Sequence, residues 1–488
     1  MFYQNMPKGV AQLNLIQVFS TVGFAVLLGT LNLYLQKVGM PIEEVNTLTA
    51  SFFALNFLLH FLGGVLGGRW ISFRGLFCFS LVLQIAGLIG IAIPHIAVIL
   101  LGMGLFVTGA GLNVSCINMM LTQLFTANDM RRRTAFSLNY AAMNIGFLFS
   151  FIVANQFQAH NNYMGAFIFA AICVGLALLL HAIAWRHVAD KNTHFAHTMH
   201  KQPIRFFAAP SAITICLVVL LYLMHHPELA SILIYVAFGI GFIVVLYSAS
   251  QQTVSTRHAM FIFIILIAAT MMYAFIQGLT GTALQNFVKY NTNQAFLGLH
   301  IEPSGFNLFE SLFVIIFGLL LARWLKYRRD HHRLPLAAQT LISRGLAINV
   351  LSFLMLPLGV WYMHVTSDSK VLLFFPILQS LFVAMAEVGV NVVSYSLAGE
   401  FVPTKWQGLF TGYMFLNIAF GTNLAGPFSN AILGRYHNLA TVSSTTTNPM
   451  YVKMFLFMAL VALVVTIIYL ILNRVITKWR AQHATEHF

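Results

Sequence analysis

Long apolar stretches of roughly 20 residues, each the length that crosses a bilayer, recur along the whole chain between short polar connections. We predict a helix for each stretch, because lipid offers the backbone no hydrogen-bond partner and the alternating pattern of a membrane barrel is absent. Fourteen spans are expected, at residues 11–35, 47–68, 76–94, 96–122, 134–156, 163–185, 210–225, 229–249, 258–288, 304–326, 337–362, 371–398, 407–433 and 452–474. The pattern therefore predicts an all-α polytopic membrane protein.

The placement of basic residues predicts the orientation of these spans. Only 8% of the chain is charged, against roughly 25% in a soluble domain. Lys and Arg gather in alternate connections, as at Arg131–Arg133 after the fourth span and at Arg328 and Arg329 after the tenth. The positive-inside rule then puts both termini in the cytoplasm of a multi-pass protein of the cell inner membrane. Topology explains the net charge of +14, and the scattered basic residues give no sign of nucleic-acid binding.

The spans fall into groups along the chain. A His-, Lys- and Thr-rich connection at 187–209 separates a six-span bundle, residues 1–186, from the later spans. The next two spans, 210–250, hold almost no interior polar residue, so we expect an accessory pair that faces lipid. Residues 251–488 supply six more spans. Six plus six, with two extra helices between the halves, is the arrangement of the major facilitator fold.

Two acidic residues stand out. The chain has 12 Asp and Glu residues, and only Glu310 and Glu387 fall inside long apolar stretches. A carboxylate at bilayer depth is costly, and one that persists there usually marks an ion or substrate path. Desolvation favours the neutral form of such a group, so it can take up a proton on one side of the membrane and release it on the other. We predict proton coupling at Glu387, assisted by Glu310.

Other polar side chains within the spans are candidates to contact a substrate in one central cavity. Each of them could instead make an ordinary bond between helices, worth about 0.6 kcal/mol on average. The candidate substrate-binding residues, with the two glutamates, are Gln17, Thr21, Asn56, His60, Tyr140, Asn144, Gln277, Asn307, Asn391 and Asn417.

Three further features have simpler interpretations than a functional site. A lone intramembrane histidine such as His60 is more often a packing residue than a pH sensor. Arg344 lies near the inner end of its helix, where we expect its side chain to reach the membrane interface. The glycines of the fourth span, Gly102, Gly104, Gly109 and Gly111, indicate close helix packing, because no phosphate-loop pattern follows them.

Four regions carry a resemblance to a known family: the first span, the fifth span, the stretch at 303–317 and the segment after Glu387. Asn139-Tyr140-Ala-Ala-Met-Asn144-Ile-Gly146 matches a fifth-helix pattern, and the glycines and aromatic residues that follow Glu387 keep the spacing of a tenth and eleventh helix, at Pro403, Gly408, Gly412, Phe415, Gly421 and Gly426. On these residues the chain resembles the proton-dependent oligopeptide transporter family of the major facilitator superfamily. The resemblance implies a secondary transporter that works by alternating access.

The chain also departs from the family pattern. The first-helix signature of two acids, an arginine and tyrosines is absent from residues 14–23, and a second family arginine is replaced by Ala25. A fourth-helix lysine is missing next to Asn113, and Ile276 stands where the family has a glutamate. Glu310 replaces a family asparagine, whereas Glu387 keeps the family's acid. In the family, the missing basic groups are implied to hold a peptide carboxylate.

We therefore expect proton-coupled symport of a peptide-like, zwitterionic or amine-bearing small solute by a monomer. Two alternatives stay open. One is proton-antiport efflux of small amphipathic or siderophore-like molecules, and the other is a non-transporting receptor or scaffold on the same fold. We expect no enzyme activity, cofactor or metal, because the chain lacks the common catalytic motifs and its four cysteines lie in apolar spans without paired spacing.

Overall fold

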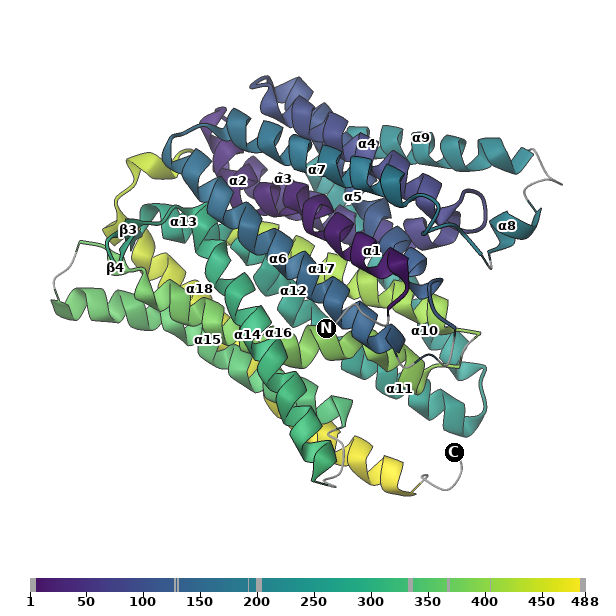
Figure 1. Ribbon diagram of the computed structural model, residues 1–488. Helices are drawn as coiled ribbons and strands as arrows, with labels where there is room; N and C mark the ends of the chain where they lie inside the picture. The colour runs from purple at the N-terminus through teal and green to yellow at the C-terminus, as the bar shows by residue number, and fades with distance from the viewer. Residues whose placement is uncertain are drawn as a thin grey trace. The chain divides into compact units, whose positions relative to one another are not determined.

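The computed structural model of the protein describes residues 6–126, 129, 131–191, 193–198, 204–331, 337–366, 369–403 and 405–482. Nearly all of these residues are helical (Figure 1). The chain divides into two units. Unit 1 is Met1–Ile234 with Glu302–Leu308, and unit 2 is Tyr235–Ile301 with Phe309–Phe488. The expected separation of an accessory helix pair from both bundles stays a prediction.

Unit 1 consists of helices alone, apart from short turns, in the part of the chain that the structure describes. Only the first residues of α10 and α14 belong to unit 1, and the rest of each helix belongs to unit 2. Its helices are α1 (Lys8–Ser20), α2 (Val22–Lys37), α3 (Ile42–Leu66), α4 (Phe73–Ala92), α5 (Ile96–Thr122), α6 (Arg131–Ala159), α7 (Tyr163–Ala184), α8 (His194–Thr198), α9 (Ile204–His225) and the starts of α10 (Pro227–Ser250) and α14 (Pro303–Asp330).

The first span continues from α1 into α2 through Thr21, which keeps helical dihedral angles and whose N–H donates to the carbonyl of Gln17 at 3.2 Å. The Thr21 hydroxyl donates to the same carbonyl, 2.8 Å away. Such a second bond to the helix backbone often bends a helix, and this point is called the break below. Helix α6 crosses at this break. A methyl group added to Gly146 would overlap Thr21 Oγ1 and the carbonyl of Val18. The family-like glycine of the fifth span therefore lets two helices touch through their backbones.

The glycines of the fourth span meet different neighbours around α5. A Cβ on Gly102 would overlap the backbone of α4 at Gly87, and one on Gly109 would overlap the carbonyl of Ser80. Gly111 faces Leu59 of α3, and Gly104 faces Leu221 of α9. The prediction that these glycines serve close helix packing is confirmed, and α5 is the centre of unit 1.

Unit 2 contains the remaining helices and four short strands. In Figure 1, α15, α16 and α18 run side by side. The elements are the rest of α10 and α14, α11 (Val254–Ile267), α12 (Ala269–Thr280), α13 (Ala283–Tyr290), β1 (Thr292–Asn293), β2 (Ala295–Phe296), β3 (Leu299–His300), α15 (Ala338–Thr366), β4 (Val371–Leu372), α16 (Phe374–Phe401), α17 (Gln407–Leu433), a 3₁₀ turn at Leu439–Thr441 and α18 (Ser444–Gln482).

The strands form two small ribbons. β1 pairs in parallel with β4, and β2 pairs with β3 in a hairpin. The hairpin turn consists of Leu297 and Gly298, both with positive φ, which is the geometry of a two-residue primed turn. This ribbon leads directly into α14.

Close backbone contact in unit 2 joins α15 with α16 and α18, and α12 with α17. Gly278 of α12 lies against the carbonyl of Thr422, and Gly345 of α15 lies against Gly389 of α16. Helix α14 differs from the others, because among the described residues it makes no extensive close backbone contact with any element.

The helices agree with the expected membrane spans. Twelve helices or runs of successive helices within the described part of the chain are long and apolar enough to cross a bilayer, and α16 and α17 add helices of 28 and 27 residues. Each of the fourteen expected spans falls on one helix or on successive helices. The prediction of an all-α polytopic membrane protein is confirmed.

Candidate functional site

Glu310 lies on α14 in unit 2 and is held by Gln277 of α12. The side-chain amide of Gln277 donates to Glu310 Oε1. The same amide nitrogen lies 2.8 Å from the Tyr273 hydroxyl oxygen, one turn earlier on α12. A carboxylate only accepts hydrogen bonds, so the amide must present its nitrogen to Glu310. The three residues form a polar chain in an otherwise apolar part of the helix pair.

Glu387 lies on α16 and is buried, with a relative exposure of 9% for the residue. The structure places both acidic residues that the sequence singled out in unit 2, where the charge of Glu387 acts on Glu310. When both carboxylates are ionised they repel each other, and a proton or a bound cation on either one relieves that repulsion.

Asn417 completes the polar residues of unit 2 that the sequence selected. Its Nδ2 donates to the carbonyl of Tyr413 on the same helix, α17, at 2.7 Å, and its Oδ1 is buried without a partner. Asn391 lies on α16, one turn after Glu387, but its side chain is outside the part of the chain that the structure describes. Asn417 is therefore both a packing residue and an open acceptor.

In unit 1, Gln17 lies in the last turn of α1, and Thr21 is the residue between α1 and α2. The Thr21 hydroxyl is occupied by the backbone of α1. The Gln17 side chain is buried, and its Oε1 has no hydrogen-bond partner. Tyr140 and Asn144 follow each other by one turn on α6, where Asn144 Nδ2 donates to the carbonyl of Tyr140 at 3.0 Å. Within this set, Gln17 Oε1 is a buried acceptor that is open to a further donor.

His60 joins α3 to α5. Its Nδ1 lies 2.9 Å from the carbonyl of Gly111, and the Ser115 hydroxyl donates to the carbonyl of His60. A carbonyl only accepts, so Nδ1 carries a hydrogen. The buried side chain thus fits the packing interpretation. Asn56, one turn earlier, differs from it because its buried Oδ1 has no partner.

Asn307 lies in the first two turns of α14, which belong to unit 1. Its Nδ2 is buried without a partner. Two side chains of α6 hold the beginning of this helix. Asn155 Oδ1 accepts from the backbone N–H of Glu302 at 2.8 Å, and Gln158 Oε1 accepts from that of Ser304 at 3.0 Å. Sequence reasoning missed Asn155 and Gln158, although a polar cluster at the end of the fifth span was a signal.

Open polar atoms occur among the selected residues of each unit. A buried polar atom without a partner costs about 1–3 kcal/mol, so such atoms need a reason. In a channel or transporter, a bound solute or water supplies the missing partner. Among the selected residues, the atoms concerned are Gln17 Oε1, Asn56 Oδ1, Asn307 Nδ2 and Asn417 Oδ1. Three accept and one donates, and none is charged.

Comparison with known proteins decides the family. The model of the POT family matches residues 68–432, which is most of the chain. The chain belongs to the POT family.

Relatives of this POT family protein are bacterial permeases. The dipeptide and tripeptide permease A of Salmonella typhimurium is 24% identical over 478 residues, covering 95% of this chain and 91% of the relative. The protein of the same description from Escherichia coli K12 is 23% identical, with coverages of 95% and 92%. The chain is therefore a divergent, nearly full-length match to transport proteins.

Solved structures share the fold. A POT family transporter in complex with 5-aminolevulinic acid has a TM-score of 0.81 at 19% identity, covering 97% of this chain and 98% of that one. A tetrameric protein, PepTSo2, has a TM-score of 0.80 at 15% identity, with coverages of 96% and 98%. The major facilitator fold predicted from the sequence is confirmed.

The structure also shows what occupies two positions where this POT family protein departs from the family pattern. Ala25 is buried in α2, and Ile276 is buried in α12 next to Gln277. Both side chains are apolar and buried, so neither supplies the charge that the family resemblance implies at its position.

Proposed function

We propose that this protein is a proton-coupled symporter of the bacterial inner membrane, with both termini in the cytoplasm, that carries small peptide-like solutes. The observation that carries the proposal is the Glu310 carboxyl group inside an apolar span, which accepts from the Gln277 amide, with Glu387 buried in the same unit. The relatives support the proposal, because they are named dipeptide and tripeptide permeases.

The charge of the site selects the solute. By the family resemblance, Ala25 and Ile276 stand where the pattern has charged residues, and the open polar atoms are neutral. A bare carboxylate bound beside two glutamates would be a buried charge without compensation. We therefore propose a neutral, zwitterionic or cationic solute whose amine faces Glu310. A free carboxylate on the solute would have to be satisfied by neutral donors such as Asn307.

We assign a different role to each of the two glutamates. Glu387 takes the proton, which leaves Glu310 as the single negative charge that receives the amine. Proton and amine together neutralise the pair, so each favours binding of the other, as symport requires. The Gln277 amide keeps the Glu310 carboxylate oriented while the ammonium approaches. Gln17, Thr21, Asn56, Tyr140, Asn144, Asn391 and Asn417 are proposed to add neutral contacts with the solute, with His60 assigned to packing.

Uptake into proteoliposomes tests the proposal. Purified protein is reconstituted, and uptake of labelled dialanine is followed with an inward, an outward or no proton gradient. We expect uptake against the solute gradient only when protons flow inward. Glu387→Gln abolishes this accumulation but retains exchange of labelled for unlabelled solute. Glu228→Gln, at an exposed position at the start of α10, is the control and leaves both unchanged.

The same experiment separates the alternatives. Accumulation driven by an outward proton flux would indicate antiport efflux of an amphipathic solute. Absence of flux with any di- or tripeptide, together with intact folding of the Glu387→Gln variant, would favour a receptor or scaffold. We propose that the monomer is sufficient, and light scattering of the active preparation tests this against the tetramer described for PepTSo2.

A further inference from the structure

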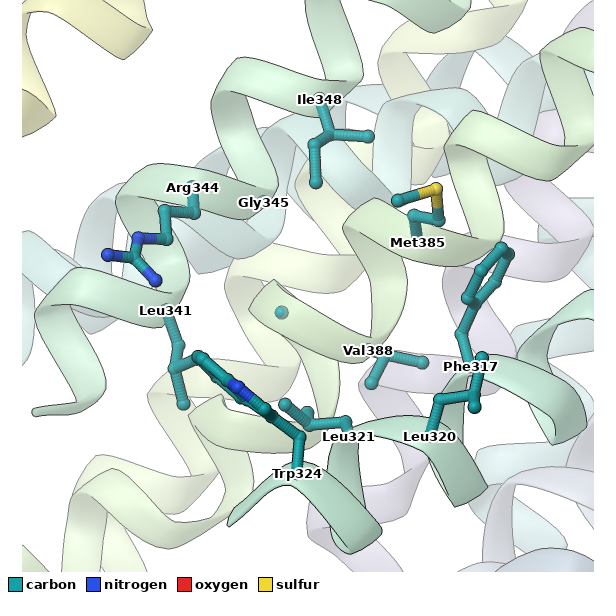
Figure 2. A pocket seen from close by; sticks show the side chains of 11 residues that line it. Phe317, Leu320, Leu321, Trp324, Leu341, Arg344, Gly345, Ile348, Met385 and Val388 are labelled. Atoms are coloured by element: carbon teal, nitrogen blue, oxygen red, sulfur yellow. The ribbon is translucent and has the colours of Figure 1, made fainter. Parts of the chain in front are cut away.

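A pocket of about 280 Å³ lies in unit 2 between the second half of α14 and the facing parts of α15 and α16 (Figure 2). Most of its lining is hydrocarbon, from residues such as Phe317 of α14, Ile348 of α15 and Val388 of α16. The exceptions are the guanidinium of Arg344 and the indole nitrogen of Trp324. The pocket is separate from the polar chain of Gln277 and Glu310, and none of the proposed solute contacts lines it.

The pocket exists because α14 stands apart from its neighbours. Gly345 and Gly389 let α15 and α16 approach through their backbones, whereas α14 makes no extensive close contact with either in the described part of the chain. A space of this size between apolar walls is unfavourable if it stays empty, because the walls lose their dispersion contacts. Something apolar must fill it in the membrane.

The polar groups sit at one end of the pocket. Figure 2 shows Trp324 and Arg344 toward one side, with Met385 and Phe317 toward the other. Trp324 is seven residues after Phe317 on α14, about 10 Å along the helix axis. Arg344 is six residues from the start of α15, and its side chain is exposed. The pocket therefore runs from the helix ends, where a membrane interface lies, toward the apolar interior.

Positive charge gathers at this end. The Arg328 guanidinium lies over the Trp324 ring, 5.5 Å from its centre, and Arg344 lies on the facing helix. No acidic residue lines the pocket. Tryptophan is enriched where a protein meets the lipid headgroups, and the arginine side chain presents a planar fork of donors that matches a phosphate. The charge and the shape together fit a molecule with an anionic head and an apolar tail.

We propose that this pocket binds one anionic phospholipid, with its phosphate on Arg344 beside Trp324 and an acyl chain along Phe317, Ile348 and Val388. A peptide is a poor occupant, because its backbone amides would be buried without hydrogen-bond partners among these side chains. A zwitterionic lipid places a cationic group beside the arginines, so it binds less favourably than an anionic lipid. Because Val388 follows Glu387 directly on α16, the bound lipid would lie close to the helix that carries the proposed proton site.

Brominated lipids test the proposal, since they quench tryptophan fluorescence on contact. The full-length protein is reconstituted in phosphatidylcholine vesicles with increasing fractions of brominated phosphatidylglycerol or brominated phosphatidylcholine. The contribution of Trp324 is the difference between wild type and Trp324→Phe. We expect this contribution to saturate at a lower fraction of phosphatidylglycerol than of phosphatidylcholine, and Arg344→Gln to raise the half-saturating fraction about fivefold, as expected for loss of a partly solvated charge-assisted bond.

Two further variants make the result decisive. Arg474→Gln removes an exposed arginine of α18 that does not line the pocket, and it should leave the quenching curve unchanged. Ile348→Phe fills the pocket from α15 and should remove the saturable component even if Arg344→Gln fails to fold. If phosphatidylglycerol and phosphatidylcholine quench Trp324 alike, or if neither Arg344→Gln nor Ile348→Phe alters the curve, the pocket holds only bulk lipid and the proposal is wrong. This test is independent of solute transport.

Discussion

Gln277 donates its side-chain hydrogen bond to Glu310 across the gap between α12 and α14, and the Tyr273 hydroxyl meets the same amide nitrogen. This contact matters because, in the described part of the chain, α14 makes no extensive close backbone contact with the other elements of unit 2. One hydrogen bond thus both orients an intramembrane carboxylate and connects its helix to α12. Any change in the charge of Glu310 will change the strength of that connection, because hydrogen bonds to ionised groups are stronger than those to neutral ones.

The first prediction concerns Gln277→Leu. Loss of the amide leaves Glu310 without its donor, so we expect the rate of proton-driven dipeptide uptake to fall about tenfold, as for a lost bond to a charged group. Tyr273→Phe is the matched control, because it removes the hydroxyl and keeps the bond between Gln277 and Glu310. Its effect should be within about twofold. Equal losses in the two variants would contradict the assignment of Gln277 as the orienting group.

The second prediction separates packing from pH sensing at His60. His60→Gln keeps an N–H that can reach the carbonyl of Gly111 but cannot titrate near neutral pH. We expect the pH profile of uptake to keep its shape in this variant. His60→Leu leaves that buried carbonyl without its donor and should cost about 1–3 kcal/mol of stability, measured as a lower melting temperature in detergent. A displaced pH profile in His60→Gln would restore the sensing role.

Sequence reasoning succeeded where the signal is local. Hydropathy located the spans because lipid forces the backbone into helices, and crowded glycines such as Gly109 indicated close packing. The breaks at Thr21 and after Thr280 escaped it, since the apolar pattern continues across them. The bonds from Gln277 to Glu310 and from Glu302 to Asn155 join distant segments. Only the folded arrangement brings their partners together, so no local pattern reveals them.

The third prediction concerns Gly146, the glycine of α6 that crosses the break in the first span. In Gly146→Ala the new methyl group would overlap Thr21 and the backbone at Val18. Backbone atoms cannot move aside cheaply, so we expect a loss of about 1–3 kcal/mol of stability. Gly175→Ala on α7, where the added methyl group meets nothing within 4 Å, should leave the melting temperature unchanged or raise it. Similar melting temperatures for the two variants would argue against backbone contact at Gly146.

The fourth prediction is a pH dependence at Asp190, in the connection after α7. Its Oδ2 accepts from the backbone N–H of Phe73 at 3.0 Å, at the start of α4. Burial raises the pKa of Asp190, although the bond to Phe73 and the charge of Arg74 act in the opposite direction. The folded state therefore favours the protonated acid, and this contribution to stability is lost as the pH rises through the raised pKa.

Asp190→Asn tests this sign, because asparagine can still accept from Phe73 but does not titrate. We expect the melting temperature of the wild type, relative to that of the variant, to fall as the pH rises from about 4, the ordinary value for Asp. Above the raised pKa the variant should be at least as stable as the wild type. A wild type that gains stability over the variant with rising pH would show that the carboxylate is stabilised instead.

The fifth prediction concerns the beginning of α14. The first N–H groups of a helix have no partner within it, and here Asn155 and Gln158 of α6 accept from two of them, at Glu302 and Ser304. Asn155→Leu and Gln158→Leu each remove one acceptor, so we expect a loss of about 1 kcal/mol per variant, as for a helix cap. Hydrogen exchange should then speed up at Glu302 in the first variant and at Ser304 in the second, by about fivefold.

The position between the two caps supplies the control for this last experiment. Gln156 lies on α6 between Asn155 and Gln158, but its side chain is exposed, so Gln156→Leu makes a comparable change of polarity without removing a cap. Exchange at Glu302 and Ser304 should stay at the wild-type rate. If it speeds up in Gln156→Leu as well, the effect comes from α6 as a whole. Only a response confined to the partner of each substituted residue supports side-chain capping of α14.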